Sequence, residues 1–531
     1  MTADWGPLDR LVARAEALAG AWGARARAST TIGQERAILR LFGVTGLDGA
    51  GRPLAGATID RWLASDPNNL GSGIALPFAM GLLEYDLDPQ QLALDVSSGA
   101  IDLSLESELL GERDRRIVAE AEASRLVAAA IDRVDAQRVV RRETIGMLGE
   151  AGRPWLGVTL HEPDVEAALD EAEAAVRAGV DLVRVEVPIG RELADRMLDA
   201  GLEVPEWQPR ARDGGQLESS AGDAAPTGSQ RALSRLRDAL DEAGAARRAY
   251  VRLATISPSL GSPEGAVVAA FERIDVIGSD AMSEIVGGVA EPDRALSDHA
   301  FAHRLAVRAG TSVVVGAGPL VVAPDLSSGF PSVPSTRAGR ALALQLLGVL
   351  LARSDGLSAD QVMVDALPSW LVEESGAAAR AIAEVTVRRT LFPAHPFAFI
   401  ETASRAERSA PWPFVQAAAA AHAGDVALIL RTSDLRGTDA AAWARTAHAA
   451  ARVSSDVAGA TVAGSLDGVA LDHARGMVTT ALETLDRLAD GGWRTIAGEP
   501  AGMTRARRGR DVVAERTESF DPLAASLARS R

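Results

Sequence analysis

Hydroxyl and carboxylate side chains are concentrated in two short segments of the chain. Both segments, ATISPSLGSPEG (254–265) and GSDAMSE (278–284), lie between an expected strand and an expected helix. The residues there that could contact a ligand are Thr255, Ser257, Ser259, Asp280 and Ser283. Hydroxyls and free backbone amides at the start of a helix bind phosphate or carboxylate groups. Ordinary helix capping uses the same residue types, so both interpretations stand.

Two histidines, His299 and His303, are four positions apart in the segment SDHAFAHRLAVRAG. A helix would place both imidazoles on one face beside Asp298, an arrangement that suits metal binding. No third ligand is evident, and the helix leads into an expected strand from the outside of the fold, so we expect a solvated face. His161 and Glu162 follow another expected strand, where acid–base chemistry and a helix-stabilising carboxylate both fit.

Short apolar runs, each followed by an alanine-rich amphipathic helix, dominate the middle of the chain. The runs span residues 155–160, 181–187, 250–254, 274–278, 311–318, 361–366, 396–401 and 425–431. Continuous apolar strands that alternate with helices indicate a parallel sheet. Eight such units predict an α/β fold with a closed (β/α)8 TIM-type barrel rather than an open doubly wound sheet. No G-x-G-x-x-G follows the first run, which further disfavours a dinucleotide-binding fold.

Three regions are expected from these patterns. Residues 1–150 carry apolar residues at helical spacing and predict a helical N-terminal region without strands. Residues 151–455 predict the TIM-type barrel, and residues 456–531 predict a helical and irregular C-terminal extension. Polar insertions at 206–230 and 324–337 follow the second and fifth strands, on the face where the loops of a barrel build an active site.

The segment STTIGQERAILRLFGVTGLDGAG (29–51) looks at first like a phosphate-binding loop that runs into a helix. A P-loop needs a preceding strand and a lysine, and the sequence offers neither here. The segment instead has the features of a helix N-terminus. Thr30 and Thr31 are cap candidates before an amphipathic helix whose apolar stripe includes Ile38 and Leu39.

The composition excludes several kinds of chemistry. The chain has no cysteine, and it also has no lysine, so all 55 lysine-plus-arginine positions are arginine. Disulfides, thiolate metal sites and a Schiff base to a lysine of this chain are therefore excluded. The net charge of −17 disfavours binding to nucleic acid or to an anionic membrane. A charged amphipathic N-terminus and the lack of a long apolar run predict a soluble, cytoplasmic protein.

Five segments of the sequence carry a family resemblance. They are TTIGQERAILRLFGVTGLD, ALDEAGAARRAYVRLA, FERIDVIGSDA, RTLFPAHP, and WRTIAGEPAG followed by FDP. In this order, over nearly the whole chain, they resemble the α subunit of D-lysine 5,6-aminomutase, an isomerase that depends on adenosylcobalamin and pyridoxal phosphate. Ordered agreement of this kind is more specific than any single motif.

The resemblance implies an α-subunit barrel with helical extensions. It also implies a hetero-oligomer with a smaller β subunit that carries the cobalamin-binding domain and the Schiff-base lysine. The absence of lysine here fits that division, as does the absence of a D-x-H-x-x-G cobalamin motif, since LDHARG (471–476) has a different spacing. The implied reaction is a radical 1,2-migration of an amino group on a small, lysine-like amino acid.

The implied phosphate site departs from the family pattern. Where the family has an arginine at the end of the second strand, this chain has Val187, and where a phosphate-binding serine follows, it has Glu192. A carboxylate there would repel a phosphate, and the neighbouring Arg191 would compensate in part. The family serine of the third loop falls on Pro258. Binding of pyridoxal phosphate is therefore an open question.

The implied ring and substrate contacts change as well. The family tyrosine that stacks on the pyridine ring corresponds to Ser283, which has no π surface. The substrate-binding aspartate after the fifth strand falls on Gly318 or, if the insertion shifts the alignment, on Asp325, and the substrate-binding lysine falls on Ala398. Two functions follow. The first is an aminomutase-like isomerase with an altered pocket, and the alternative is a non-catalytic paralogue that binds a partner during assembly or reactivation.

Overall fold

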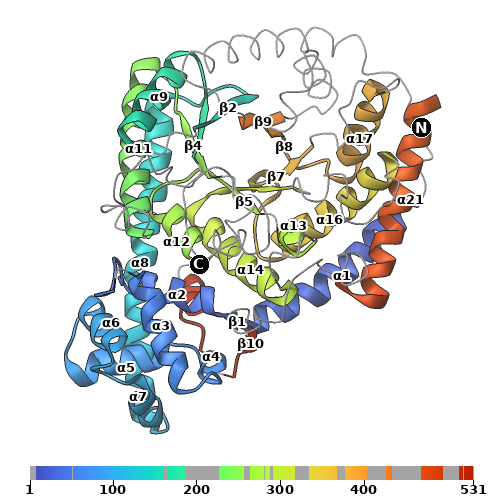
Figure 1. Cartoon of the computed structure of the whole chain (residues 1–531). Coiled ribbons are helices and arrows are strands. Elements are labelled where there is room, and N and C mark those ends of the chain that lie inside the picture. Colours follow the sequence, from blue (N-terminus) through green and yellow to red (C-terminus); the bar gives the residue numbers. More distant parts are fainter. Residues whose placement is uncertain are drawn as a thin grey trace, which may run out of the picture.

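A closed barrel of eight parallel strands forms the centre of the molecule (Figure 1). The barrel strands are β2 (Trp155–Leu160), β3 (Leu182–Val185), β4 (Arg252–Thr255), β5 (Val276–Ser279), β6 (Ser312–Val315), β7 (Val362–Asp365), β8 (Phe397–Thr402) and β9 (Val426–Thr432). Their order around the barrel follows the sequence, and β9 closes on β2. The expected TIM-type barrel is confirmed, and each expected apolar run overlaps one of its strands.

The computed structural model describes most of the chain. The described residues are 7–50, 52–160, 165–185, 226–255, 263–279, 281–286, 291–316, 334–366, 377–402, 426–432, 468–493, 513–517 and 520–529. Within these ranges, no helix is long and apolar enough to cross a membrane.

Helices surround the barrel. They are α1 (Leu8–Ala28), α9 (Val165–Arg177), α11 (Pro226–Arg247), α12 (Pro263–Phe271), α13 (Ala281–Val286), α14 (Pro292–Ala309), α16 (Pro334–Ser354), the short 3-10 helix η2 (Ala359–Gln361), α17 (Ala377–Leu391) and α21 (Gly468–Gly491). From opposite ends of the sequence, α1 and α21 lie side by side against α16 (Figure 1). A Cβ on Gly339 would lie 2.6 Å from the carbonyl oxygen of Met477, so α16 and α21 need a glycine at their contact.

A second group of helices precedes the barrel in the sequence and lies beside it (Figure 1). These helices are α2 (Ile32–Leu41), α3 (Leu54–Ser65), α4 (Asn69–Ser72), α5 (Ala75–Tyr85), α6 (Pro89–Ser98), α7 (Leu103–Leu109) and α8 (Arg113–Leu148). All of them except α4 share an apolar core with α12 and α14, and α22 (Pro522–Arg529) contributes Leu523 to it. The boundaries at 150 and 455 stay predictions, and α21, which follows residue 455, packs against α16 and α17 of the barrel layer.

The expectation of no strand in the N-terminal region was wrong. Residues Ser29–Thr31 form β1, which pairs antiparallel with β10 (Val513–Glu515) near the end of the chain. Thr31 then caps α2, since its side chain accepts a hydrogen bond from the Gln34 backbone at 3.1 Å, and this confirms one of the two cap candidates. The cap satisfies an amide that the first turn of a helix leaves without a partner.

The rest of the same segment is a buried joint between distant parts of the chain. The carboxylate of Glu35 accepts hydrogen bonds from the Thr30 hydroxyl and, at 2.7 Å, from the Ile74 backbone. Burial raises the pKa of Glu35, and nearby Arg516 opposes that rise. Arg516 also donates to the side chain of Gln34 at 2.8 Å. The segment that resembles a phosphate loop therefore connects β10 to the N-terminal helices.

Side chains alternate along each barrel strand between the interior and the helix layer. The interior cluster includes Trp155, Leu182, Ala254, Val276, Val314, Met363, Ala398, Leu428 and Leu430. Residues at alternate positions, such as Val183 and Val364, pack instead with the surrounding helices. A Cβ on Gly157 would lie 2.8 Å from a methyl group of Leu430, so the interior is filled at this level. The alternation decides which residues beyond this layer face the mouth of the barrel.

Candidate functional site

A buried arginine faces the barrel interior near the C-terminal ends of the strands. Arg184 follows the interior residue Leu182 by two positions on β3, and Thr159 follows Trp155 by four on β2. The two residues are register partners, and the Arg184 guanidinium donates to the Thr159 hydroxyl at 3.2 Å. Arg184 is 5% exposed. Active sites of TIM-type barrels lie at this end of the strands, so a buried cation is in place for an anionic ligand group.

A carboxylate lies across the barrel from this arginine. Asp365 is the last residue of β7, two positions after the interior residue Met363. In the closed order β7 is four strands from β3, which is the opposite side of an eight-stranded barrel. Gly278, two positions after the interior residue Val276 on β5, adds no side chain to this level. The mouth therefore combines a cation and a carboxylate on facing walls.

Sequence reasoning missed both of these residues, although a local signal exists for each. In DLVRVEV, Arg184 falls on the same side of the strand as Leu182, and alternation alone would have aimed it inward. The same rule aims Asp365 inward in QVMVDA. Treating each apolar run as uniformly buried hid the difference between the two faces of each strand.

The histidine pair is buried, so the expected solvated face was wrong. His299 and His303 are each 3% exposed on the side of α14 that faces β5. The Ser279 hydroxyl lies 2.9 Å from His299 Nδ1 and 2.7 Å from His303 Nε2. His303 Nδ1 lies 2.9 Å from a carboxylate oxygen of Asp355. Helices around a barrel turn one face toward the strands, and the pair is on that face.

This serine–histidine–aspartate cluster lies in the helix layer rather than in the mouth. Ser279 is separated by an odd number of positions from the interior residue Val276, which places it on the outward side of β5. Arg27 of α1 donates to the other oxygen of Asp355 at 3.1 Å, so the cluster connects β5 to α1, α14 and α16. Within the described ranges, no group of three or more acidic, histidine or cysteine residues could hold a metal ion.

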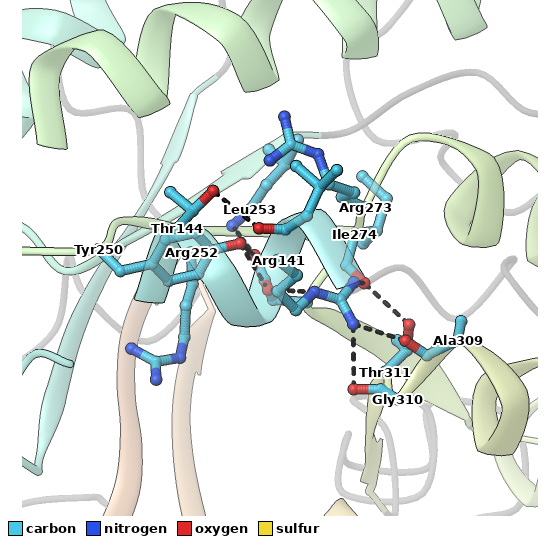
Figure 2. A network of polar contacts seen from close by, with 12 residues as sticks. Arg141, Thr144, Tyr250, Arg252, Leu253, Arg273, Ile274, Ala309, Gly310 and Thr311 are labelled. Carbon is cyan, nitrogen blue, oxygen red and sulfur yellow. Dashed lines mark hydrogen bonds and ion pairs between the residues drawn. The ribbon is translucent and has the colours of Figure 1, made fainter. Parts of the chain in front are cut away.

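Charged residues also meet at the opposite, N-terminal end of the barrel (Figure 2). Asp275, just before β5, accepts from the Tyr250 hydroxyl at 2.9 Å and from the Leu253 backbone at 2.9 Å. Arg141 of α8 lies 3.0 Å from the same carboxylate, and Arg237 of α11 lies 3.4 Å from it. Burial raises the pKa of Tyr250, and the charge of Asp275 adds to the rise. These contacts join α8 and α11 to the start of β5 and to the segment that leads into β4.

Two arginines at this end, Arg141 and Arg252, make the connecting contacts. Arg141 donates to three carbonyl oxygens, those of Ile274, Ala309 and Gly310, at 2.8, 2.7 and 3.1 Å (Figure 2). Arg252 faces the barrel interior below Ala254, where its guanidinium stacks 3.5 Å from the ring centre of Trp155. Burial lowers the pKa of Arg252.

The structure describes only part of the site predicted from sequence. Thr255 is 1% exposed at the end of β4, on the outward side by alternation with the interior residue Ala254. Ser283 lies in α13, and its side chain is outside the description. Ala398 is fully buried in the barrel interior. The following predicted positions lie outside the described residues: His161, Glu162, Val187, Arg191, Glu192, Ser257, Pro258, Ser259, Asp280, Gly318 and Asp325.

The closed parallel barrel, with ionic side chains at the C-terminal end of its strands, defines a protein of the TIM-barrel class. The family model described as the D-lysine 5,6-aminomutase TIM-barrel domain of the alpha subunit matches residues 3–404. This match covers most of the chain, so the chain belongs to that family, as its segments indicated.

Two curated relatives have the same description. The lysine 5,6-aminomutase alpha subunit of Acetoanaerobium sticklandii is 28% identical over 287 residues, which is 54% of this chain and 51% of the relative. That of Fusobacterium nucleatum is 26% identical over 314 residues, which is 59% of this chain and 56% of the relative. The chain thus spans about half the length of the curated relatives it matches.

The solved structures that match this chain include dihydropteroate synthases. That of Coxiella burnetii, in complex with pteroic acid, is 13% identical with a TM-score of 0.35, and the match covers 58% of this chain and 95% of that one. The enzyme of Anaplasma phagocytophilum is 12% identical with a TM-score of 0.35, and the match covers 57% and 98%.

Proposed function

We propose that the chain is the α-subunit-like component of an adenosylcobalamin-dependent, pyridoxal-phosphate-assisted aminomutase. The proposed reaction moves an amino group between adjacent carbons of a lysine-like amino acid by a radical route. Membership of the aminomutase α-subunit family supports this proposal. The observation that supports a ligand site for this function is the buried Arg184, which is hydrogen-bonded to Thr159 at the C-terminal end of the barrel.

The residues at the mouth fit the phosphate group of a phosphorylated cofactor, whereas the lysine that would bind its aldehyde is left to a partner. Arg184 offers a delocalised cation with several donors, which suits a phosphate or carboxylate group. Its hydrogen bond to Thr159 holds the guanidinium of Arg184 toward the interior. The chain has no lysine to capture the aldehyde of pyridoxal phosphate, so that lysine comes from the partner. The bound cofactors supply radical generation and radical stabilisation.

This chain contributes binding, orientation and exclusion of water. The interior cluster below Arg184 fills the barrel as far as Gly157, so a ligand rests on an apolar floor. Charged groups above such a floor interact more strongly than they would in water. Arg191, Ser257, Ser259, Asp280 and Ser283 stay proposed cofactor contacts, and Asp325 stays a proposed substrate contact. The proposed partner is a cobalamin-binding β subunit, and the proposed location is the cytoplasm.

Co-purification tests this function. The chain is produced together with a β-subunit candidate encoded nearby, and the absorption spectrum is recorded after adding adenosylcobalamin and pyridoxal phosphate. We expect a stable complex that retains both cofactors and converts a lysine-like substrate. A complex that retains cobalamin without any pyridoxal absorption band contradicts the aminomutase reaction.

The second candidate is a non-catalytic paralogue that binds a partner during assembly or reactivation. Ala398 favours it, because the family's substrate lysine corresponds to this residue and Ala398 is fully buried in the interior. Binding of the β subunit without retention of either cofactor supports this candidate. The two candidates thus separate in the same experiment.

A further inference from the structure

A buried polar chain runs from helix α21 to the last residue of β7. The Gln345 side chain on α16 donates to the carbonyl oxygen of Asp365. Arg388 Nε on α17 donates to Gln345 Oε1 at 2.9 Å. Arg388 also donates to Glu384 at 3.2 Å, and the other oxygen of Glu384 lies 3.1 Å from His473 of α21. We call Gln345, Arg388, Glu384 and His473 the α21 relay.

The α21 relay is shielded from water along its whole length. Glu384 is fully buried, Arg388 and Gln345 are each 1% exposed, and His473 is 5% exposed. Buried charges keep a fixed geometry, because losing one partner leaves the other uncompensated. Gln345 is therefore held by a hydrogen bond from Arg388, which is itself paired with Glu384. Its amide group has one orientation in which it both accepts from Arg388 and donates to the carbonyl oxygen of Asp365.

The relay contacts β7 at its last residue, Asp365. The amides of Val364 and Ala366 bond toward β8, which turns the carbonyl of Asp365 toward β6. Among the described residues the β6 ladder ends at Val315, opposite Val364, so Asp365 lies one position beyond the last pair. Gln345 donates to the carbonyl of Asp365 from the helix layer. The peptide that carries Asp365 is thereby fixed from the helix layer, while its side chain faces the mouth.

We infer that Asp365 binds the ammonium group of the amino acid in the barrel mouth, and that the α21 relay positions it for this role. Arg184 would hold the anionic group of the same assembly on the facing wall. This inference rests on the proposed function for the nature of the ligand. A carboxylate that binds ammonium contributes a charge-assisted hydrogen bond, which an uncharged amide replaces poorly.

A pair of probes that differ by one amino group tests the inference. The full chain is titrated with 6-aminohexanoate and with hexanoate by calorimetry. We expect tighter binding of 6-aminohexanoate, and we expect Asp365→Asn to reduce that preference about tenfold or more while hexanoate binding stays unchanged. Asp365→Glu keeps the charge and should retain part of the preference. Equal preference in the wild-type chain and Asp365→Asn overturns the inference.

Matched controls separate the role of Asp365 from general damage. Asp360→Asn removes a carboxylate at the other end of the same strand, in η2 (Ala359–Gln361), and should leave the preference unchanged. Gln345→Met keeps a similar volume but removes the donor to Asp365, and it should weaken the preference for the amine without changing hexanoate binding. If Gln345→Met keeps the full preference for the amine while Asp365→Asn loses it, Asp365 binds the ammonium group but the α21 relay does not position it.

Failure of this inference is distinguishable from failure of the proposed function. The amine preference is measured on the chain alone, whereas cobalamin retention requires the β subunit. A chain that prefers the amine but captures no cofactor has an ammonium site without the aminomutase reaction. If the complex retains both cofactors but Asp365→Asn has no effect on the amine preference, the proposed function stands and the ammonium site at Asp365 is contradicted.

Discussion

At the N-terminal end of the barrel, Asp275 accepts from a tyrosine, a backbone amide and two arginines, whereas at the C-terminal end Arg184 and Asp365 face each other from opposite strands. The first arrangement neutralises its charges within the fold and joins α8 and α11 to the strands. In the second, a cation and a carboxylate stay on separate walls. The difference separates residues that hold the barrel together from the residues that we propose for ligand binding.

The largest expected effect is at the N-terminal end. Asp275→Ala leaves Arg141 and Arg237 without their shared buried carboxylate, so the free energy of unfolding should fall by about 3–5 kcal/mol. Urea denaturation followed by circular dichroism measures this fall. The control is Asp490→Ala at a carboxylate that is 83% exposed, where we expect a change within about 0.5 kcal/mol. A loss below about 1 kcal/mol for Asp275→Ala would contradict the structural role of this end.

The second effect concerns ligand binding at the mouth. Arg184→Met should weaken binding of pyridoxal phosphate by about 10- to 100-fold, because a charge-assisted hydrogen bond to the phosphate is lost. The unfolding midpoint should change little, since removal of a buried cation also removes its desolvation cost. Arg252→Met is the matched control, as it removes a second buried arginine of the barrel interior at the other end. If the two variants bind equally, the comparison between the ends fails.

A smaller effect is expected for Tyr250→Phe. Loss of the hydrogen bond to Asp275 should lower the free energy of unfolding by about 1–2 kcal/mol near neutral pH. The pKa of Tyr250 is raised in the folded chain, so its contribution is complete below the unfolded value of about 10 and is lost as pH rises above it. Urea titrations at several alkaline pH values should show a shallower loss of stability for the phenylalanine variant.

Tyr85 serves as an internal control for this pH dependence. It is the other tyrosine of the chain, and its pKa is also raised, mainly by a hydrogen bond with Glu106. Both proteins retain Tyr85, so the difference between their pH profiles belongs to Tyr250. Identical alkaline profiles would mean that Tyr250 ionises as readily in the folded chain as in the unfolded one.

The smallest effect is expected outside the barrel, at the start of α2. Thr31→Ala removes the N-cap hydrogen bond from the Gln34 backbone and the hydrogen bond that the Thr31 hydroxyl donates to Asp298, and it should lower stability by about 1 kcal/mol. Thr31→Ser keeps the hydroxyl and should restore most of the loss. Thermal unfolding of the three proteins measures the difference. A serine variant as unstable as the alanine variant would assign the effect to the methyl group of Thr31 instead.

The barrel was predictable from the sequence because its signals are local. Each strand is a short apolar run between amphipathic helices, and eight such runs leave few alternative folds. The pair β1–β10 was missed because three-residue strands carry no pattern, and their pairing joins Ser29 to Glu515. The histidine pair was misplaced because its partners, Ser279 and Asp355, lie 20 or more positions away in the sequence.

The candidate site was predictable to a smaller extent. Its position at the C-terminal ends of the strands follows from the fold class. The residues proposed for it came mostly from the loops after the strands, and most of these lie outside the described residues. Thr255, the last residue of β4, is described and turns outward. Arg184 and Asp365 could have been found from strand alternation alone. The loop residues depend on long-range packing, which no short sequence pattern reports.

The pairing of β1 with β10 also has a consequence for synthesis of the chain. The ribosome releases Ser29–Thr31 almost five hundred residues before Val513–Glu515, and the buried joint around Gln34 and Glu35 needs Arg516. The helices that precede the barrel therefore cannot complete their native contacts until the ribosome has also released Arg516. They are made before the barrel, yet their final structure requires a segment that is made after it.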